Sequence, residues 1–381
     1  MIAHFFAASN QVSNRLVHSR QEIMPIRTEP QIDQPAVLRI RTSAPASLPK
    51  NQRLPALDFT KGALVLIMVL YHWVNYFIGP QWPYYKYLRF LTPSFIFITG
   101  FMISHVYLSK YAASDPRLSK RLFTRGLKLI AIFLVLNVAR NLVVPLLGTG
   151  DAIQNLPSLS NIQTIFVSGN LPAVGSKLVS FPILVPIGYV LMLSAVLMHP
   201  YKTHKYIFHL TCAVLLSFIL MLWCAGSYSY NLEFIAIGML GVLTGLVPFG
   251  MVSKFGRHPY ALAASYLGYL ISITLWNVPF PLLIVGVVLS LIVIYSLCGN
   301  KQGAVKNEVI LLGKYSLLGY ISQVAILQVL RAAFSRIDLG FSVVPISFLA
   351  AFVLTIVSVE VVDRARTRAV TVDRLYKAVF A

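Results

Sequence analysis

The chain has 381 residues, of which 57% are hydrophobic and only 12% are charged, and its mean hydropathy is +0.73. Soluble globular domains carry about 25% charged residues, so this composition excludes an ordinary soluble domain. The formal net charge of +20 follows the membrane topology argued below and does not indicate nucleic-acid binding. The composition predicts an all-α polytopic integral membrane protein.

Residues 1–49 hold Gln, Ser, Pro and scattered Arg without sustained hydrophobic periodicity. They predict a disordered cytoplasmic tail, because so few apolar groups cannot offset the entropy of ordering. The apolar start at 2–8 is too short for the hydrophobic region of a secretory signal. The three cysteines (Cys212, Cys224 and Cys298) all fall in predicted spans, where they are expected to be small apolar fillers.

Ten apolar stretches beyond the tail are long enough to cross a hydrocarbon core of about 30 Å. They lie at 62–78, 90–109, 129–148, 178–198, 206–226, 232–250, 259–277, 278–298, 315–334 and 340–362. Residues 50–362 are therefore predicted to form one ten-helix membrane domain, followed by a basic tail at 363–381.

Most Lys and Arg residues lie before the first span, after the even-numbered spans and after the last one. Short loops that keep positive charge stay in the cytoplasm, so both termini are predicted to be cytoplasmic. The expected location is a membrane, most simply the inner (plasma) membrane of a bacterium.

His72 lies in the first predicted span, eleven residues after Lys61. This spacing is close to three helical turns, so the two residues share one helix face and lie roughly 16 Å apart along the axis. An ionisable side chain among apolar residues indicates a functional site, with a packing imidazole as the alternative. Asp58 could orient Lys61 or Arg53, but capping of the first helix is the role that we favour.

Polar groups also occur on the predicted outer side. Arg140 and Asn141 lie near the outer end of the third span, and Glu233 begins the sixth. An Arg140–Glu233 pair beside an acceptor is one hypothesis, and an arginine that extends to the interface is the other. The outer segment 149–177 could be a lid or acceptor surface, or a plain solvated connector. No metal or nucleotide cofactor is expected, because the sequence has no CxxC, HExxH, EF-hand, P-loop or GxGxxG pattern.

Four motifs in order resemble the membrane-bound acyltransferase-3 superfamily. The first is the Leu-Asp-Phe-Thr-Lys-Gly stretch at 57–62, with His72 after it. The second is the Thr-Pro-Ser-Phe-Ile-Phe-Ile-Thr-Gly-Phe stretch at 92–101, and the third is the basic stretch at 120–128. The last is the Gly-Lys-Tyr-Ser stretch at 313–316, with Tyr320 after it. Lys61 stands where the family usually has Arg, and Gln323 where it usually has His. The first motif also resembles the branch with glucan succinyltransferases and, more distantly, the lysosomal glucosaminide N-acetyltransferases.

The resemblance implies transfer of an acetyl or succinyl group from cytoplasmic acyl-coenzyme A (acyl-CoA) to a hydroxyl of a glycan, glycolipid or other envelope acceptor. O-acylation is favoured over N-acylation, His72 is the implied general base, and a homo-oligomer is a further option. The implied donor-binding residues are Lys61, Arg53, Arg121, Arg125, Lys128, Lys314 and Ser316, and the implied orienting or acceptor-side residues are Asp58, Arg140, Asn141 and Glu233. The alternative function is a proton-coupled transporter or a lipid or glycan flippase, in which His72 would relay protons.

Overall fold

The computed structural model describes residues 54–79, 82–108, 115–146, 162–170, 180–201, 203–247, 258–276, 278–298, 303–334 and 342–380. All the described residues belong to one compact unit, within residues 50–381. The predicted tail at 1–49, Arg53 and most of the outer segment 149–177 lie outside the described residues. Within the described part the regular elements are helices, with no strand, as the composition predicts.

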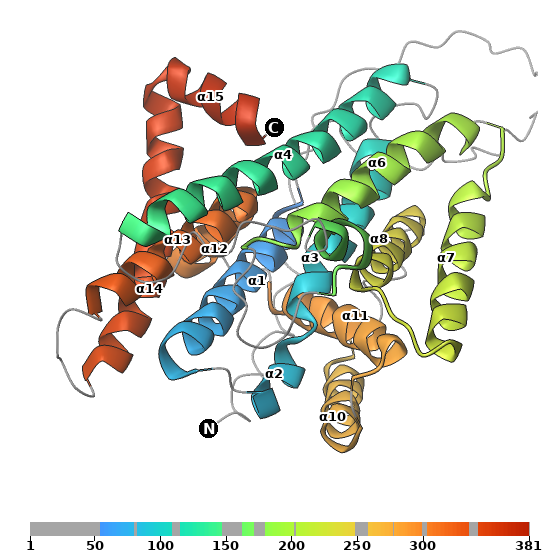
Figure 1. The fold of residues 1–381 in the computed structure, drawn as a ribbon, viewed down its shortest axis with the longest axis horizontal. Helices are drawn as coiled ribbons and strands as arrows, with labels where there is room; N and C mark the ends of the chain where they lie inside the picture. The colour runs from blue at the N-terminus through green and yellow to red at the C-terminus, as the bar shows by residue number, and fades with distance from the viewer. Residues whose placement is uncertain are drawn as a thin grey trace, which may run out of the picture. The chain divides into compact units, whose positions relative to one another are not determined.

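Eight helical segments in the described part are long and apolar enough to cross a membrane. The first joins α1 (Pro55–Trp73) to the π-helical η1 (Val74–Ile78), and the second runs from within α2 (Trp82–Leu88) through α3 (Leu91–Met102) and η2 (Ile103–Leu108) (Figure 1). The others are α4 (Pro116–Leu146), α6 (Leu184–Tyr201), α7 (Ile207–Cys224), α11 (Phe280–Leu297), α13 (Ser316–Phe334) and α14 (Val343–Arg368).

Two further apolar helices, α8 (Tyr230–Leu246) and α10 (Pro259–Leu275), are shorter and coincide with the sixth and seventh predicted spans. Every predicted span therefore overlaps an apolar helix, while the count of ten spans and the orientation stay predictions. A short π-helical segment, η4 (Thr164–Ser168), lies in the predicted outer loop.

Several predicted boundaries are wrong because polar residues continue the helices. The first helix begins at Pro55, where proline suits the first helical position, and the third begins at Pro116. Two helices also occupy segments that were predicted as loop and tail: α12 (Ala304–Lys314) and α15 (Val370–Phe380). Both mix apolar and charged residues, so no long apolar run marks them in the sequence.

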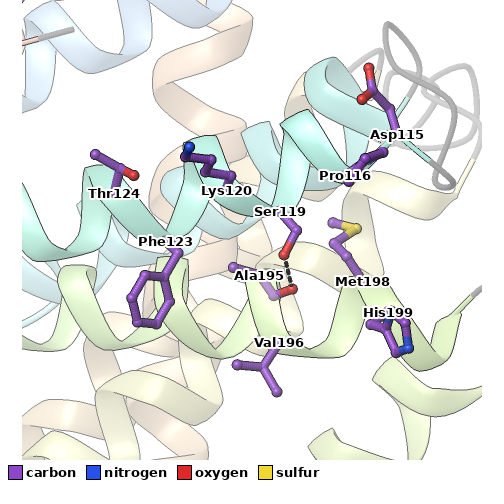
Figure 2. A pocket seen from close by; sticks show the side chains of 10 residues that line it. All are labelled: Asp115, Pro116, Ser119, Lys120, Phe123, Thr124, Ala195, Val196, Met198 and His199. Atoms are coloured by element: carbon purple, nitrogen blue, oxygen red, sulfur yellow. Dashed lines mark hydrogen bonds between the residues drawn. The ribbon is translucent and has the colours of Figure 1, made fainter.

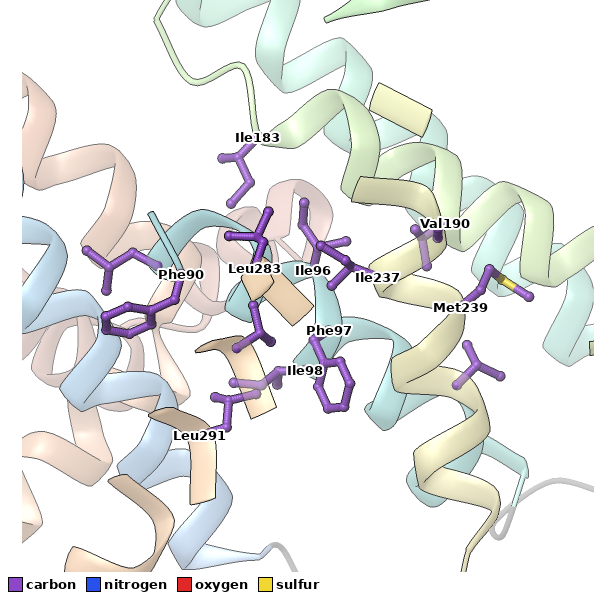
Figure 3. Close-up of a cluster of buried hydrophobic side chains, with 14 of the residues drawn as sticks. Phe90, Ile96, Phe97, Ile98, Ile183, Val190, Ile237, Met239, Leu283 and Leu291 are labelled. Atoms are coloured by element: carbon purple, nitrogen blue, oxygen red, sulfur yellow. The ribbon is translucent and has the colours of Figure 1, made fainter. Parts of the chain in front are cut away.

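The central packing layer surrounds α3. Its side chains Ile96 and Phe97 are buried against residues of three other helices, as Figure 3 shows. These partners include Ile237 on α8, Val190 on α6 and Leu283 on α11. The helix that follows the first span is thus enclosed by the protein and positions its neighbours.

Glycines allow two pairs of helices to touch through their backbones. A Cβ atom added at Gly100 of α3 would lie 1.9 Å from the carbonyl oxygen of Gly238 on α8. A Cβ at Gly62 of α1 would lie 1.9 Å from the Val309 oxygen on α12, and one at Gly313 would lie 1.7 Å from the Asp58 oxygen. Small residues at such crossings permit close van der Waals packing, which is a main source of helix association in membranes.

The last helix, α15, is held against the start of α13 by one hydrogen-bonded cluster. Arg366 donates to the Tyr315 hydroxyl at 2.9 Å and to Asp373 at 2.6 Å, and its guanidinium lies 4.0 Å from the centre of the Tyr376 ring. Hydrogen bonds from Lys377 and then from Arg366 hold the pKa of Asp373 below its usual value. The predicted tail therefore contains an ordered helix that packs beside the Gly-Lys-Tyr-Ser motif.

We predict that Gly313→Ala lowers the melting temperature of the purified protein by several degrees. The added methyl must displace the backbone of α1, and overpacking of this kind costs about 1–3 kcal/mol or more. Gly268→Ala is the matched control, because a Cβ there meets nothing within 4 Å. Equal melting temperatures for Gly313→Ala and wild type would contradict the backbone contact.

Candidate functional site

His72 lies in the last turn of α1, next to the π-helical extension η1. π-Helical turns inside helices are frequent at functional sites. The imidazole is partly buried, and its ring centre lies 5.0 Å from that of Tyr71 and 6.4 Å from that of Tyr320. The histidine of the first motif and the tyrosine of the last motif therefore meet between α1 and α13.

The wall beside Tyr320 is formed by Phe181, whose ring centre lies 5.5 Å away in an edge-to-face arrangement. Phe181 has a φ of 63°, in the left-handed region that costs an ordinary residue about 1–2 kcal/mol. Asn137 holds the preceding residue on both sides: its amide donates to the Ser180 oxygen at 2.9 Å and its side-chain oxygen accepts from the Ser180 nitrogen at 2.7 Å. This clamp keeps the Phe181 ring against Tyr320.

More polar side chains surround His72 on α1 and its neighbours. The centre of the Tyr71 ring lies 5.3 Å from that of the Tyr85 ring on α2. One turn beyond His72, the Tyr76 hydroxyl accepts a hydrogen bond of 3.4 Å from Gln328 of α13. This group of tyrosines was not predicted, although tyrosines recur at the end of the first span and at 84–87.

Gln323 occupies the position where the resembling family has a histidine, one turn after Tyr320. Its side chain is fully buried, and neither its amide nitrogen nor its oxygen has a hydrogen-bond partner among the described residues. A buried unpaired polar group costs about 1–3 kcal/mol, so each case requires an explanation. A polar ligand that reaches this helix interface would satisfy the amide.

Asp58 and Lys61 form an ion pair of 2.6 Å in the first turns of α1, with side chains only 12% and 18% exposed. The favoured capping role of Asp58 is wrong, because the helix begins earlier and its N-cap residue is Leu54. The alternative, that Asp58 orients Lys61, agrees with the ion pair. Arg53, the other suggested partner, lies outside the described residues.

The glycine contact between α1 and α12 also joins two motifs that are far apart in the sequence. Gly62 follows Lys61, and Gly313 precedes Lys314, so both lysines flank the same backbone crossing. Lys314 is exposed, and Ser316 is the first residue of α13. We call Lys61 and Lys314 the cationic rim: it lies at the start of the helix that carries His72, with Asp58 balancing the charge of Lys61.

The predicted donor-binding cations of α4 point in different directions. The guanidinium of Arg125 lies 5.4 Å from the centre of the Tyr107 ring on η2, while Arg121 is exposed and Lys128 is partly buried. Arg125 thus faces the protein interior. The role of these three residues in donor binding stays a prediction.

A cavity of about 510 Å³ lies between the start of α4 and the end of α6 (Figure 2). Lys120 and His199 line it, together with apolar residues such as Phe123, and Ser119 donates a hydrogen bond of 2.7 Å to the Ala195 oxygen across it. None of its lining residues is a predicted site residue, so this cavity is separate from the surroundings of His72.

The hypothesised Arg140–Glu233 pair is not formed among the described residues. Glu233 is buried at the start of α8 and interacts electrostatically with Arg89, whereas Arg140 interacts with Tyr76. Asn141 is partly buried beside Arg140. The partners of both charged residues depend on which helices are neighbours, and hydropathy and spacing do not predict those neighbours. No group of three or more metal-ligating side chains occurs in the described part of the chain.

A family model described as the catalytic region of heparan-alpha-glucosaminide N-acetyltransferase matches residues 53–147. The match covers the segment from α1 through α4 that contains Lys61 and His72, and it leaves the rest of the chain uncovered. It supports the likeness to membrane acetyltransferases and does not support the succinyltransferase branch in particular. No curated protein and no solved structure matches the chain significantly.

We predict that Asp58→Asn lowers the melting temperature, because it leaves the largely buried Lys61 ammonium without its partner. The expected cost is about 1–3 kcal/mol, and the double variant Asp58→Asn/Lys61→Met should recover part of it. Glu360→Gln, which removes the exposed partner of Arg364, is the control and should have little effect. Equal melting temperatures for Asp58→Asn and Glu360→Gln would show that the first pair has no special role.

Proposed function

We propose that the chain is an integral-membrane acyltransferase that moves an acetyl group from acetyl-CoA to a carbohydrate acceptor. The observation that carries this proposal is the meeting of His72 with Tyr320 inside the membrane domain, on the same helix as the Asp58–Lys61 pair. The match of 53–147 to an N-acetyltransferase catalytic region supports it independently.

The proposed chemistry uses His72 as a general base. Neutral imidazole takes the proton of the acceptor nucleophile while that nucleophile attacks the thioester carbonyl. The tetrahedral intermediate then collapses, the carbon–sulfur bond breaks, and the leaving thiolate receives the proton from the imidazolium. The products are the acylated acceptor and free coenzyme A, and His72 is again neutral.

The donor would enter at the cationic rim. Lys61 and Lys314 flank the crossing of α1 with α12, and ammonium groups there would bind the phosphates of the coenzyme as charge-assisted partners. The extended pantetheine arm would then bridge the roughly 16 Å along α1 between Lys61 and His72. This arrangement separates the anionic part of the donor from the reacting carbonyl.

The acyl group and the acceptor atom are the finer parts of the proposal. Acetyl is preferred over succinyl, because the matched family model describes an acetyltransferase. The hydroxyl acceptor implied by the first resemblance now competes with an amine acceptor, which the matched description names. A glucosamine acceptor offers both nucleophiles in one molecule, so analysis of its acetylated product distinguishes ester from amide.

His72→Gln is expected to lower acyl transfer by ~10²–10⁴-fold, the usual contribution of a positioned base. Glutamine keeps a hydrogen-bonding side chain of similar size but cannot accept the proton. Purified protein in lipid nanodiscs would be assayed for acetyl-CoA consumption with glucosamine as acceptor, and donor binding should persist. Near-normal transfer by His72→Gln would exclude the general-base role, and a wild type that neither binds nor consumes acetyl-CoA would favour the transporter alternative.

Gln323→Leu should raise the melting temperature, because it removes a buried amide without partners at about 1–3 kcal/mol. If that amide binds the acyl group or the acceptor, the same variant loses acyl transfer while becoming more stable. Ser290→Ala is the control, since its buried hydroxyl on α11 also has no partner among the described residues and no proposed role. Full activity of Gln323→Leu would remove Gln323 from the site.

A further inference from the structure

Tyr76 interacts with two arginines that lie on different helices. The guanidinium of Arg331 on α13 lies 5.9 Å from the centre of the Tyr76 ring, and Arg140 on α4 interacts with Tyr76 electrostatically. Gln328 donates to the Tyr76 hydroxyl from a third position. The exposed Arg331 and the partly buried Gln328 of α13 therefore contact Tyr76 of η1, and the partly buried Arg140 of α4 acts on the same phenol.

No carboxylate neutralises these two cations within the described part of the chain. The described ion pairs join Lys61 to Asp58, Arg364 to Glu360, and both Arg366 and Lys377 to Asp373, which leaves Arg140 and Arg331 without an acidic partner. Charged side chains within membrane helices are costly and usually serve a function. An anion bound beside the Tyr76 phenol would supply the negative charge that both guanidiniums lack.

We propose that Arg140, Arg331, Gln328 and Tyr76 form a phosphate-binding site at the end of the membrane domain opposite Lys61. Guanidinium groups offer paired N–H donors that match phosphate oxygens, and the amide and hydroxyl would bind the remaining oxygens. Tyr76 follows His72 by one turn, or roughly 6 Å along the helix. A sugar attached to the bound phosphate would thus lie beside the imidazole.

The role of this site, which is to anchor a phosphorylated carbohydrate acceptor, rests on the proposed function, whereas phosphate binding itself does not. The chemistry of the site is the same for the phosphate of a lipid headgroup. The two sources differ in what else is attached, so a soluble sugar phosphate and a phospholipid can be tested separately on the same protein.

The experiment uses the full chain purified in dodecyl maltoside, a detergent without phosphate. Binding of glucose 1-phosphate and, in a second arm, of short-chain phosphatidylglycerol is measured by the shift of the melting temperature with ligand concentration. The variants are Arg140→Gln/Arg331→Gln and the charge-preserving Arg140→Lys/Arg331→Lys. Lys86→Gln is the matched control, because this cation is predicted on the same side but donates to the Thr274 oxygen on α10.

Glucose 1-phosphate should stabilise the wild type and Lys86→Gln equally, and its affinity should fall about ten-fold or more in the double glutamine variant. The affinity of the double lysine variant should be intermediate, since it keeps both charges but loses the paired N–H donors. If the double glutamine variant does not fold, the lysine variant provides the test in its place. Binding of phosphatidylglycerol alone would support the site but overturn the acceptor role. Equal affinities of wild type and the double glutamine variant for both ligands would overturn the site.

No donor is present in this measurement, so its outcome is independent of the acyltransferase assay. If His72→Gln retains activity while the arginine variants lose phosphate binding, the proposed base is wrong and the phosphate site stands. If acetyl transfer depends on His72 while phosphate binding does not depend on the arginines, only the further inference fails.

Discussion

The backbone contact between α1 and α12 fixes the position of the candidate donor rim relative to His72. Gly62 and Gly313 permit an approach that any Cβ would prevent, and this approach holds the start of α1 beside the start of α13. Because α13 carries Tyr320, the same contact helps to determine where the tyrosine ring meets the imidazole. The two motifs are thus structurally dependent on each other although some 250 residues separate them.

Polar side chains inside this domain have few possible hydrogen-bond partners other than one another. In an apolar surrounding without water, each hydroxyl, amide or charged group must find a partner in the protein or retain an energetic cost. Asn137 meets this requirement through its two hydrogen bonds to the backbone of Ser180. Gln323 does not meet it among the described residues. We therefore regard the α1–α13 interface as the region where hydrogen bonds from a bound ligand would stabilise the protein most.

The parts of the fold that follow from helix periodicity were predictable from the sequence. The relation of Lys61 to His72 within one helix depends only on their spacing, and α1 contains both. The apolar runs located the helices, because a run of that length can be stable only inside the membrane or the protein core. The amphipathic helices α12 and α15 were not predicted, since charged and polar residues interrupt their apolar ones and no long apolar run marks them.

The contacts between helices were not predictable in the same way. An Arg140–Glu233 pair is one hypothesis from the sequence, because both residues lie near the outer end of a predicted span, yet Arg89 is the cation that acts on Glu233. The hydropathy pattern predicts how deep a residue lies in the membrane, but it does not predict which helices are neighbours. Several helices carry cations at a similar depth, so only the structure shows which cation lies near Glu233.

The contacts between helices show how positive charge is distributed along α1 and its neighbours. At one end of α1, Lys61 is held by Asp58, so its ammonium has a fixed position but a reduced net field. At the other end, Arg140 and Arg331 act on Tyr76 without a described carboxylate. His72 lies between these two regions on the same helix. An anionic donor and an anionic acceptor entering from opposite ends would each meet positive charge first and the imidazole last, which keeps their phosphates apart while their reacting groups approach.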